Sequence, residues 1–227
     1  MNALPWIVVP YLAVVLFLGG HIWRWRTDRL GWTTRSSQLL EQRWLRLGSP
    51  LFHVGILGVV GGHVLGILVP KRVTDAMGVS EHAYHVLSLA AGGFFGTLAL
   101  AGLVILTLRR LLVRRVRRAG GANDLAVDLL LLVVVGLGMG ETFGWNLGVG
   151  AYAYRETVSV WFRQLPTLHP DASLMSGAPW VYQAHVLASL ALFALWPFSR
   201  LVHVWTAPVQ YVVRRAHVLY RSPAEPA

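Results

Sequence analysis

Long apolar stretches separated by short polar loops dominate this sequence. Five segments are nearly free of charged side chains, at about residues 5–23, 50–70, 85–108, 124–144 and 180–205. Each is close to the roughly 20 residues that a helix needs to cross a bilayer. Each is expected to be helical, because lipid offers the backbone no hydrogen-bond partners. The pattern predicts an all-α integral membrane bundle of five transmembrane helices, one membrane domain over residues 1–227.

The second apolar segment, Leu51–Val69, contains two histidines, His53 and His63, together with five glycines. The fifth segment contains a second pair, His185 and His203. Ionisable side chains inside a membrane span are costly, and by default they are functional candidates. These four histidines are therefore the first candidates for chemistry.

The segment between the fourth and fifth spans, residues 151–179, is too polar to cross the membrane and too aromatic for a free linker. Its aromatic residues include Tyr152, Tyr154, Trp161 and Phe162. We expect an interfacial segment on the outer face, with a helix followed by a loop at Pro166 and Pro170.

Composition supports the membrane class. Of the 227 residues, 55% are hydrophobic and only 13% are charged, which is unusual for a soluble domain. There is no cysteine, so disulfides, cysteine-ligated iron–sulfur clusters and covalently attached haem are excluded. Any redox centre must be held non-covalently, with histidine as the candidate ligand. The first apolar run has no basic region before it, so no cleavable signal peptide is expected.

The positive charge is distributed unevenly between the loops. The net charge is +10, and 16 of the 20 basic residues fall between the first and second spans, between the third and fourth, or at the end of the fifth and in the tail. The positive-inside rule then predicts an outer N-terminus and a cytoplasmic C-terminus. Topology in a prokaryotic cell membrane and contact with lipids account for this charge, so no nucleic-acid partner is expected.

Given this orientation, the second and fifth spans run in opposite directions. Antiparallel packing pairs His63 with His185 near the outer face and His53 with His203 near the inner face. Neutral imidazole is a good axial ligand for haem iron, and a bundle can hold a cofactor between facing helices. The pattern favours two bis-histidine sites for two haem b groups. The alternatives are polar contacts between helices, or a proton relay.

The spacing of the two histidine pairs is unequal. Ten helical residues rise about 15 Å and eighteen rise about 27 Å, so straight upright helices would not match. Helix tilt, or a kink at Pro197, could absorb part of the difference. In a continuous helix His185 and His203 share a face, whereas His53 and His63 lie roughly 80° apart. The two haem planes are therefore expected to differ in orientation.

Three glycines of the second span, Gly58, Gly62 and Gly66, recur every four residues. One interpretation is that glycine lets the backbone approach the flat face of a porphyrin. The other is the small-residue pattern of close helix packing. Both interpretations stay open at this stage.

Three motifs connect the chain to a known family. They are SSQLLE at Ser36–Glu41, LFHVGILGVVGGHVLGILVP at Leu51–Pro70, and WPFSRLVHVWTAPVQY at Trp196–Tyr211. With these motifs and five spans in the same order, the chain resembles the gamma subunit of respiratory nitrate reductase, a dihaem cytochrome b membrane anchor. The resemblance covers essentially the whole chain.

The resemblance implies that His63 and His185 hold the outer haem and that His53 and His203 hold the inner one. It implies quinol oxidation near the outer haem. Electrons would pass through both haems to a cytoplasmic iron–sulfur beta subunit. A molybdenum-containing alpha subunit would then reduce nitrate to nitrite.

The expected quinol site departs from the family pattern. A known member of the family has a lysine near the start of the third span, whereas this sequence has Tyr84 at about that place, with His82 and His85 nearby. Either histidine could hydrogen-bond a quinol or accept its proton, or both could be ordinary interfacial residues. Gly62, beside His63, is expected to leave space for the quinol ring.

Further residues are candidates for supporting roles. Arg109, Arg110 and Arg200 could meet haem propionates or lipid phosphates, and lipid is favoured for most of them. A role for Ser36 near the inner haem rests on the resemblance alone. Asp128 needs a partner such as an arginine. For Glu141, structural pairing and a proton path are both open.

Three rival functions remain. The same two haems could serve another quinol-linked reductase, for example of a sulfur compound. A proton channel or transporter could use the histidines as a relay, although the first and third spans offer few polar residues for a continuous path. A passive membrane anchor would leave four buried histidines without a purpose.

Overall fold

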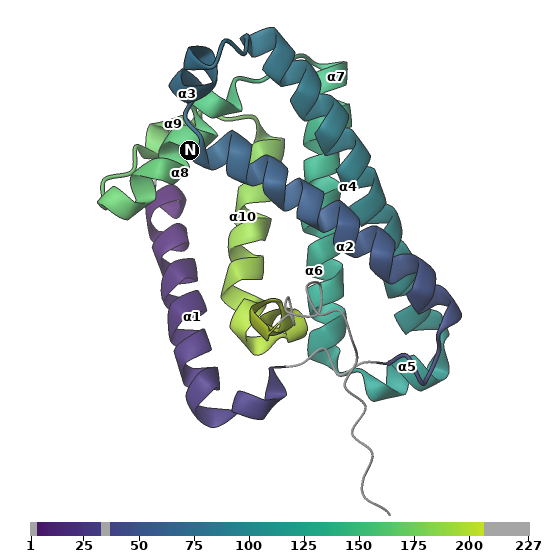
Figure 1. The fold of residues 1–227 in the computed structure, drawn as a ribbon. Coiled ribbons are helices and arrows are strands. Elements are labelled where there is room, and N and C mark those ends of the chain that lie inside the picture. The colour runs from purple at the N-terminus through teal and green to yellow at the C-terminus, as the bar shows by residue number, and fades with distance from the viewer. Residues whose placement is uncertain (1–3, 33–36, 207–227) are drawn as a thin grey trace, which may run out of the picture.

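The computed structural model describes residues 4–32 and 37–206. Within those ranges every regular element is helical, and five helices are long and apolar enough to cross a membrane (Figure 1). The predicted all-α class and the number of spans are confirmed. Ser36, the tail arginines and the end of the third family motif lie outside the described residues. We name the two ends of the bundle outer (His63) and inner (His53), following the predicted orientation.

The long helices contain several irregular segments. The first span is α1 (Pro5–Thr27), and the third is α4 (Glu81–Leu112). The second consists of α2 (Arg43–His63) and the π-helical η2 (Val64–Leu68). The fourth consists of α6 (Ala122–Met139), the π-helical η3 (Gly140–Trp145) and α7 (Asn146–Gly148). The fifth consists of α10 (Trp180–Leu195) and the 3-10 turn η6 (Trp196–Phe198).

Short elements connect the spans. They are η1 (Arg29–Gly31), α3 (Lys71–Ala76), α5 (Arg114–Ala119), η4 (Tyr154–Glu156), α8 (Val158–Gln164), η5 (Leu165–Thr167), α9 (Ala172–Ser176) and η7 (Arg200–Thr206). Four of them, η4, α8, η5 and α9, form the segment that was expected at the outer interface.

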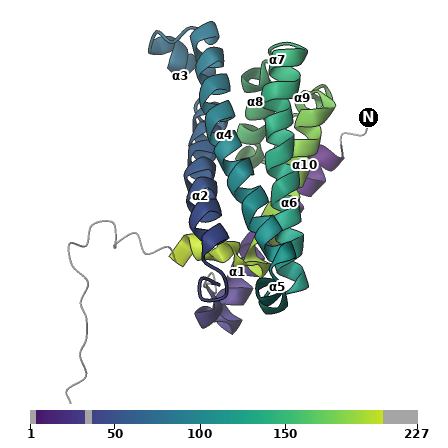
Figure 2. The ribbon, with the colours of Figure 1, turned by 90° about the vertical axis from the view of Figure 1, so that its right-hand side faces the viewer.

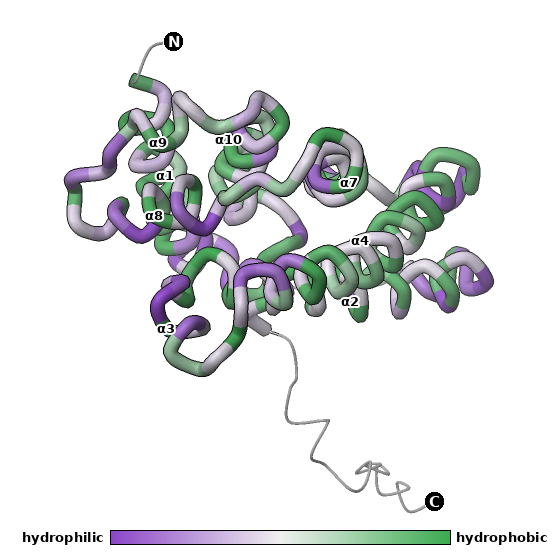
Figure 3. The backbone as a smooth tube through the Cα atoms, turned by 90° about the horizontal axis from the view of Figure 1, so that it is seen from above, coloured by the Kyte–Doolittle hydropathy of each residue, from purple (hydrophilic) through white to green (hydrophobic). Residues whose placement is uncertain are grey.

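The long helices form an arc, which is seen from above in Figure 3. Packing runs from α1 to α10, from α10 to α6, from α6 to α4, and from α4 to α2. The last pair has the closest contact. A Cβ atom on Gly55 would collide with the backbone of Ala99, and one on Gly102 would collide with the backbone of Phe52. Helix α2 therefore packs along α4, while its opposite face is turned toward α10.

The second span begins earlier than expected. Its helix starts at Arg43 and includes Pro50, whereas the apolar pattern predicts a start near residue 50. The carboxylate of Glu41 accepts the backbone N–H of Trp44 at 3.0 Å, which satisfies one of the free donors at the helix start. These first turns belong to the helix although their arginines place them outside the long apolar run.

The fifth helix does not continue to residue 205, and at Pro197, where a kink was one expectation, the structure has a complete break. Helix α10 ends at Leu195, Pro197 lies in η6, and Ser199 is extended with φ −116° and ψ 179°. The guanidinium of Arg24 donates to the carbonyls of Pro197 and Ser199, at 2.7 Å each, and so satisfies acceptors that the break leaves free.

The break changes the geometry of the histidines on this span. Segment η7 runs across the inner end of the bundle instead of continuing α10 (Figure 2). His203 is therefore not on the same helix as His185, and the predicted rise of about 27 Å and shared face do not apply.

The outer segment is more deeply buried than an interfacial helix would be. Trp161 of α8 is 1% exposed, packs edge-on against Trp6 at 6.2 Å between ring centroids, and donates its indole N–H to the Trp6 carbonyl at 3.0 Å. Met175 of α9 belongs to the same apolar cluster. The segment thus covers the outer ends of α1 and α10.

Arginine–carboxylate contacts fasten the inner end. Arg110 of α4 lies 2.7 Å from Asp128 and 3.3 Å from Asp124 of α6, which confirms the predicted partner for Asp128. Arg109 is buried and donates to the carboxylate of Glu41 at 2.6 Å, to the Ser37 hydroxyl at 2.9 Å, and to both of their backbone carbonyls. These bonds attach the loop before α2 to the end of α4.

We predict that Arg109→Ala destabilises the protein by about 3 kcal/mol, because it leaves Glu41 and two carbonyls without their buried donor. Unfolding measured in detergent micelles would show this. Arg115→Ala, at an exposed position of α5, should change the unfolding free energy by no more than about 0.5 kcal/mol. Equal effects of the two variants would contradict the structural role of Arg109.

Candidate functional site

The four candidate histidines form two pairs between α2 and the fifth span. His63 of α2 faces His185 of α10, with ring centroids 6.0 Å apart and ring planes 10° from parallel. His53 of α2 faces His203 of η7, with centroids 6.3 Å apart and planes at 70°. The structure therefore brings together the same pairs that antiparallel packing predicts, one toward each end of the bundle.

In three of these histidines one ring nitrogen is already bonded. The Nδ1 atoms of His53, His63 and His203 lie 2.7–2.8 Å from the backbone carbonyls of Ser49, Val59 and Arg200. A carbonyl can only accept, so each Nδ1 carries the proton and donates it. Each Nε2 atom is then left with a free lone pair, the form in which imidazole binds a metal.

The separation of the facing rings fits a single ion between them. Metal–imidazole bonds are about 2 Å long, so ring centroids about 6 Å apart would leave room for one ion held by both imidazoles. Within residues 4–32 and 37–206 no three His, Asp or Glu side chains gather as a metal site. Two protein ligands per ion suit a metal whose other positions are filled by a macrocycle.

Space beside His63 is also consistent with a flat group. A Cβ atom on Gly61 or Gly62 would meet no atom within 4 Å. Gly58, by contrast, packs on the ring of Phe95, and Gly66 packs against the hydroxyls of two tyrosines. Close packing thus accounts for Gly58 and Gly66, while Gly61 and Gly62 leave the helix surface open.

Those two tyrosines, Tyr84 of α4 and Tyr154 of η4, form a polar contact at the outer end. Their hydroxyls lie 3.3 Å apart, and both approach Gly66, three residues after His63. Burial raises the pKa of Tyr154 above its ordinary value, so its hydroxyl stays protonated at neutral pH. The Tyr154 hydroxyl can therefore donate one hydrogen bond and accept others at neutral pH.

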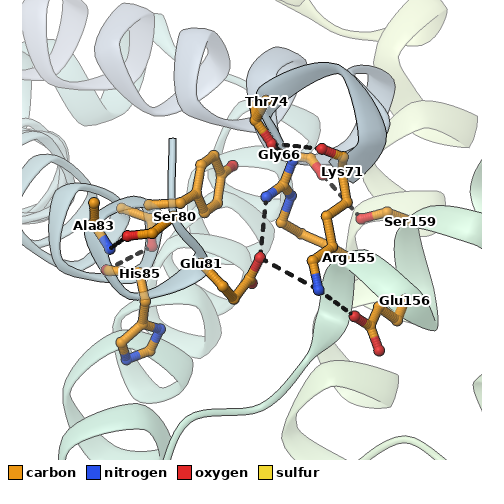
Figure 4. A network of polar contacts seen from close by, with 12 residues as sticks. Gly66, Lys71, Thr74, Ser80, Glu81, Ala83, His85, Arg155, Glu156 and Ser159 are labelled. Carbon is orange, nitrogen blue, oxygen red and sulfur yellow. Dashed lines mark hydrogen bonds and ion pairs between the residues drawn. The ribbon is translucent and has the colours of Figure 1, made fainter. Parts of the chain in front are cut away.

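Arg155 holds Tyr84 in place, and Figure 4 shows this arginine beside Glu81. Its guanidinium is buried, lies 3.8 Å from the centroid of the Tyr84 ring, and donates to Thr74 at 2.8 Å and to Glu81 at 3.5 Å. Lys71 extends the network to Glu81 at 3.7 Å and to Glu156 at 2.7 Å. The Lys71 hydrogen bond lowers the pKa of Glu156, which favours the ionised pair.

Sequence reasoning missed Tyr154 and Arg155. The available signal was that Arg155 is one of only four basic residues outside the three arginine-rich regions. Of the residues that were predicted at this end, Tyr84 joins the network, His82 is exposed, and His85 points away from it in Figure 4.

The predicted support residues lie at the inner end. Arg110 and Arg200 both line a cavity of about 260 Å³ close to the loop before α2. Arg200 also forms an ion pair with Asp124 at 2.5 Å. Arg109 is directed toward Ser37 and Glu41 instead, and Ser36 lies outside the described residues.

The chain is similar to known proteins over almost its whole length. The family model for the nitrate reductase gamma subunit matches residues 2–223. The chain is 45% identical over 217 residues to the nitrate reductase gamma chain of Bacillus subtilis, covering 96% of both chains. It is 33% identical over 216 residues to the respiratory nitrate reductase 1 gamma chain of Escherichia coli, covering 95% of both.

A third relative is a larger protein. The nitrate reductase-like protein NarX of Mycobacterium tuberculosis is 48% identical over 226 residues, which are 99% of this chain but 34% of that protein. Because the family model matches almost the full length of this chain, the chain belongs to the nitrate reductase gamma subunit family.

Proposed function

We propose that this chain is the dihaem cytochrome b subunit that oxidises membrane quinol for a nitrate reductase complex. One observation carries the proposal: two facing imidazole pairs, with centroids 6.0 and 6.3 Å apart, connect the same two spans toward opposite ends of the bundle. When bound, two haem b groups would supply one-electron carriers toward the two faces of the membrane.

In this proposal the protein's residues ligate, orient and make space. His63 with His185 would be the axial ligands near the outer face, and His53 with His203 those near the inner face. The backbone carbonyls that accept from Nδ1 fix three of the four rings with Nε2 available. The open surface at Gly61 and Gly62 gives room beside the outer pair.

We assign the quinol site to the outer end, between Gly62 and the Tyr84–Tyr154 hydroxyl pair. Gly62 and Gly66 lie four residues apart on α2–η2, and the two hydroxyls lie beside Gly66. They are therefore at one end of the open helix surface next to His63. Arg155 holds Tyr84 so that its hydroxyl can hydrogen-bond one quinol oxygen, in place of the lysine known from one family member. His82 and His85 remain candidates to accept the protons, which would leave on the outer face.

The electron acceptors would be a cytoplasmic iron–sulfur beta subunit and a molybdenum-containing alpha subunit that reduces nitrate. The relatives named as nitrate reductase gamma chains support this partner set over a reductase for another acceptor. The inner surface, with Arg110 and Arg200 close to the segment that carries His203, is the natural side for docking.

We predict that the haems are lost selectively. His63→Leu and His185→Leu should each remove the outer haem and quinol oxidation, and His53→Leu and His203→Leu should each remove the inner haem, because each variant deletes one of two axial ligands. Redox difference spectra of the purified complex measure both. The exposed His169→Leu is the control and should keep both haems. Loss of the opposite haem would overturn the pairing, and a colourless parent would support a histidine relay.

We predict that Tyr84→Phe raises the KM for a quinol analogue about tenfold, since one hydrogen bond contributes about 1 kcal/mol or slightly more. Both haems should keep their spectra. Steady-state quinol oxidation by the complex measures this, with Tyr11→Phe on α1 as the control. An unchanged KM in the Tyr84 variant would remove Tyr84 from the site.

For the two neighbouring histidines we predict that His82→Ala combined with His85→Ala slows quinol oxidation without loss of haem. The expected cause is a missing proton acceptor near neutral pH. Unchanged kinetics would identify both as ordinary interfacial residues.

A further inference from the structure

One of the four candidate ligands lacks the hydrogen bond that the other three make. The Nδ1 atom of His185 is buried and has no hydrogen-bond partner. A buried N–H without an acceptor costs about 1–3 kcal/mol. Metal-bound histidines almost always donate this N–H to a carboxylate, a carbonyl or a water molecule. The Val134 carbonyl also lies near this ring but makes no well-formed bond to Nδ1, so a better-placed acceptor is expected close by.

Glu141 is placed to be that acceptor. Its carboxylate Oε1 lies 4.0 Å from His185 Nδ1, and both side chains are mostly buried, at 17% and 13% exposure. Among the described residues Glu141 has no lysine or arginine partner. A closer approach of about 1 Å would bring the two atoms within hydrogen-bond distance.

The backbone around Glu141 also turns this side chain toward His185. Glu141 is the second residue of η3, and π-helical turns within α-helices often occur at functional sites. One turn earlier, Gly138 lets the imidazole pack against the helix: a Cβ there would lie 3.0 Å from His185 Cε1 and 3.4 Å from Nδ1. Gly138 and Glu141 together form a surface that fits one edge of this ring.

Two hydrogen bonds of Asn146 connect this surface to α10. The side-chain amide of Asn146 donates to the carbonyl of Glu141 at 2.8 Å and to the hydroxyl of Tyr182 at 2.9 Å. Tyr182 lies one helical turn before His185. The same amide thus stabilises the π-helical segment and sets its position relative to the imidazole.

We propose that Glu141 is a positioning residue for His185, whose Nδ1–H its side-chain oxygen accepts. The inference rests on the proposed ligation of the outer haem by His185. A carboxylate acceptor raises the basicity of an imidazole ligand more than a carbonyl does. A more basic ligand favours ferric over ferrous iron, so Glu141 lowers the reduction potential of the outer haem and leaves the inner one unaffected.

Three substitutions separate a hydrogen bond from a simple charge effect. Glu141→Asp keeps the charge but withdraws the oxygens by one methylene group. Glu141→Gln keeps an acceptor at the same reach but removes the charge, and Glu141→Leu removes both. The readout is a potentiometric titration of both haems in the purified complex, together with the low-spin EPR signal of the oxidised outer haem. Asp75→Asn, an exposed carboxylate on α3, is the control.

We expect Glu141→Asp and Glu141→Leu to raise the outer haem's potential by about 59 mV, which corresponds to a tenfold change in the ferric-over-ferrous preference. Glu141→Gln should shift it less and keep the parental EPR signal. The inner haem and the Asp75→Asn complex should not change.

A larger shift for Gln than for Asp would show that only the charge acts, and would overturn the proposal. So would an unchanged outer haem in all three variants, or equal shifts of both haems. If Glu141→Leu does not assemble, the comparison of Asp with Gln decides. A parent complex without an outer haem would instead refute the proposed function itself.

Discussion

Imidazole within an apolar membrane bundle must have a partner, and this constraint shapes the whole chain. Four such side chains lie on two spans, and the fold brings each within about 6 Å of another. The strongest packing of α2 is nevertheless with α4, where glycines allow the backbones to touch. Helix α2 is thus held firmly from one side, while its histidines reach α10 and η7 from the other.

The two histidine pairs are not equivalent. At the inner end the rings are at 70° and both bond to backbone carbonyls, next to arginine–carboxylate contacts. At the outer end the rings are nearly parallel, one of them faces Glu141, and a buried arginine fixes the neighbouring tyrosine pair. Both π-helical segments, η2 and η3, are also at the outer end. The outer end therefore combines an open helix surface at Gly62 with a carboxylate, an arginine and two tyrosines, as a site for a small polar molecule requires.

Much of this arrangement could be predicted from the sequence because membrane physics is restrictive. Span length, the need for helices and the cost of intramembrane histidines predict the fold class and the pairing of His63 with His185 and of His53 with His203. The arginine partner of Asp128 could be predicted for the same reason, because a carboxylate inside a membrane span is also costly without a partner. A kink at Pro197 could be predicted, but a complete break after α10 could not, because two of the carbonyls it frees are bonded by Arg24 from a distant helix.

The outer site shows the same limit. Tyr84 could be suggested from its place in the third span. Tyr154 and Arg155 come from a segment without a clear helical pattern, and only the fold brings them to Gly66. The start of α2 at Arg43 also escaped prediction, since capping by Glu41 has no apolar signature.

The central claim is that the two facing imidazole pairs are two haem sites. Its most direct test is the haem b content of the purified, folded complex, measured by pyridine haemochrome absorbance against protein concentration. The account predicts about two haem b groups per copy of this chain. It also predicts two distinct components in an optical redox titration, because the two ligand pairs differ in ring angle and hydrogen bonding. A folded complex with no haem in this chain, or with a single haem per chain, would contradict it.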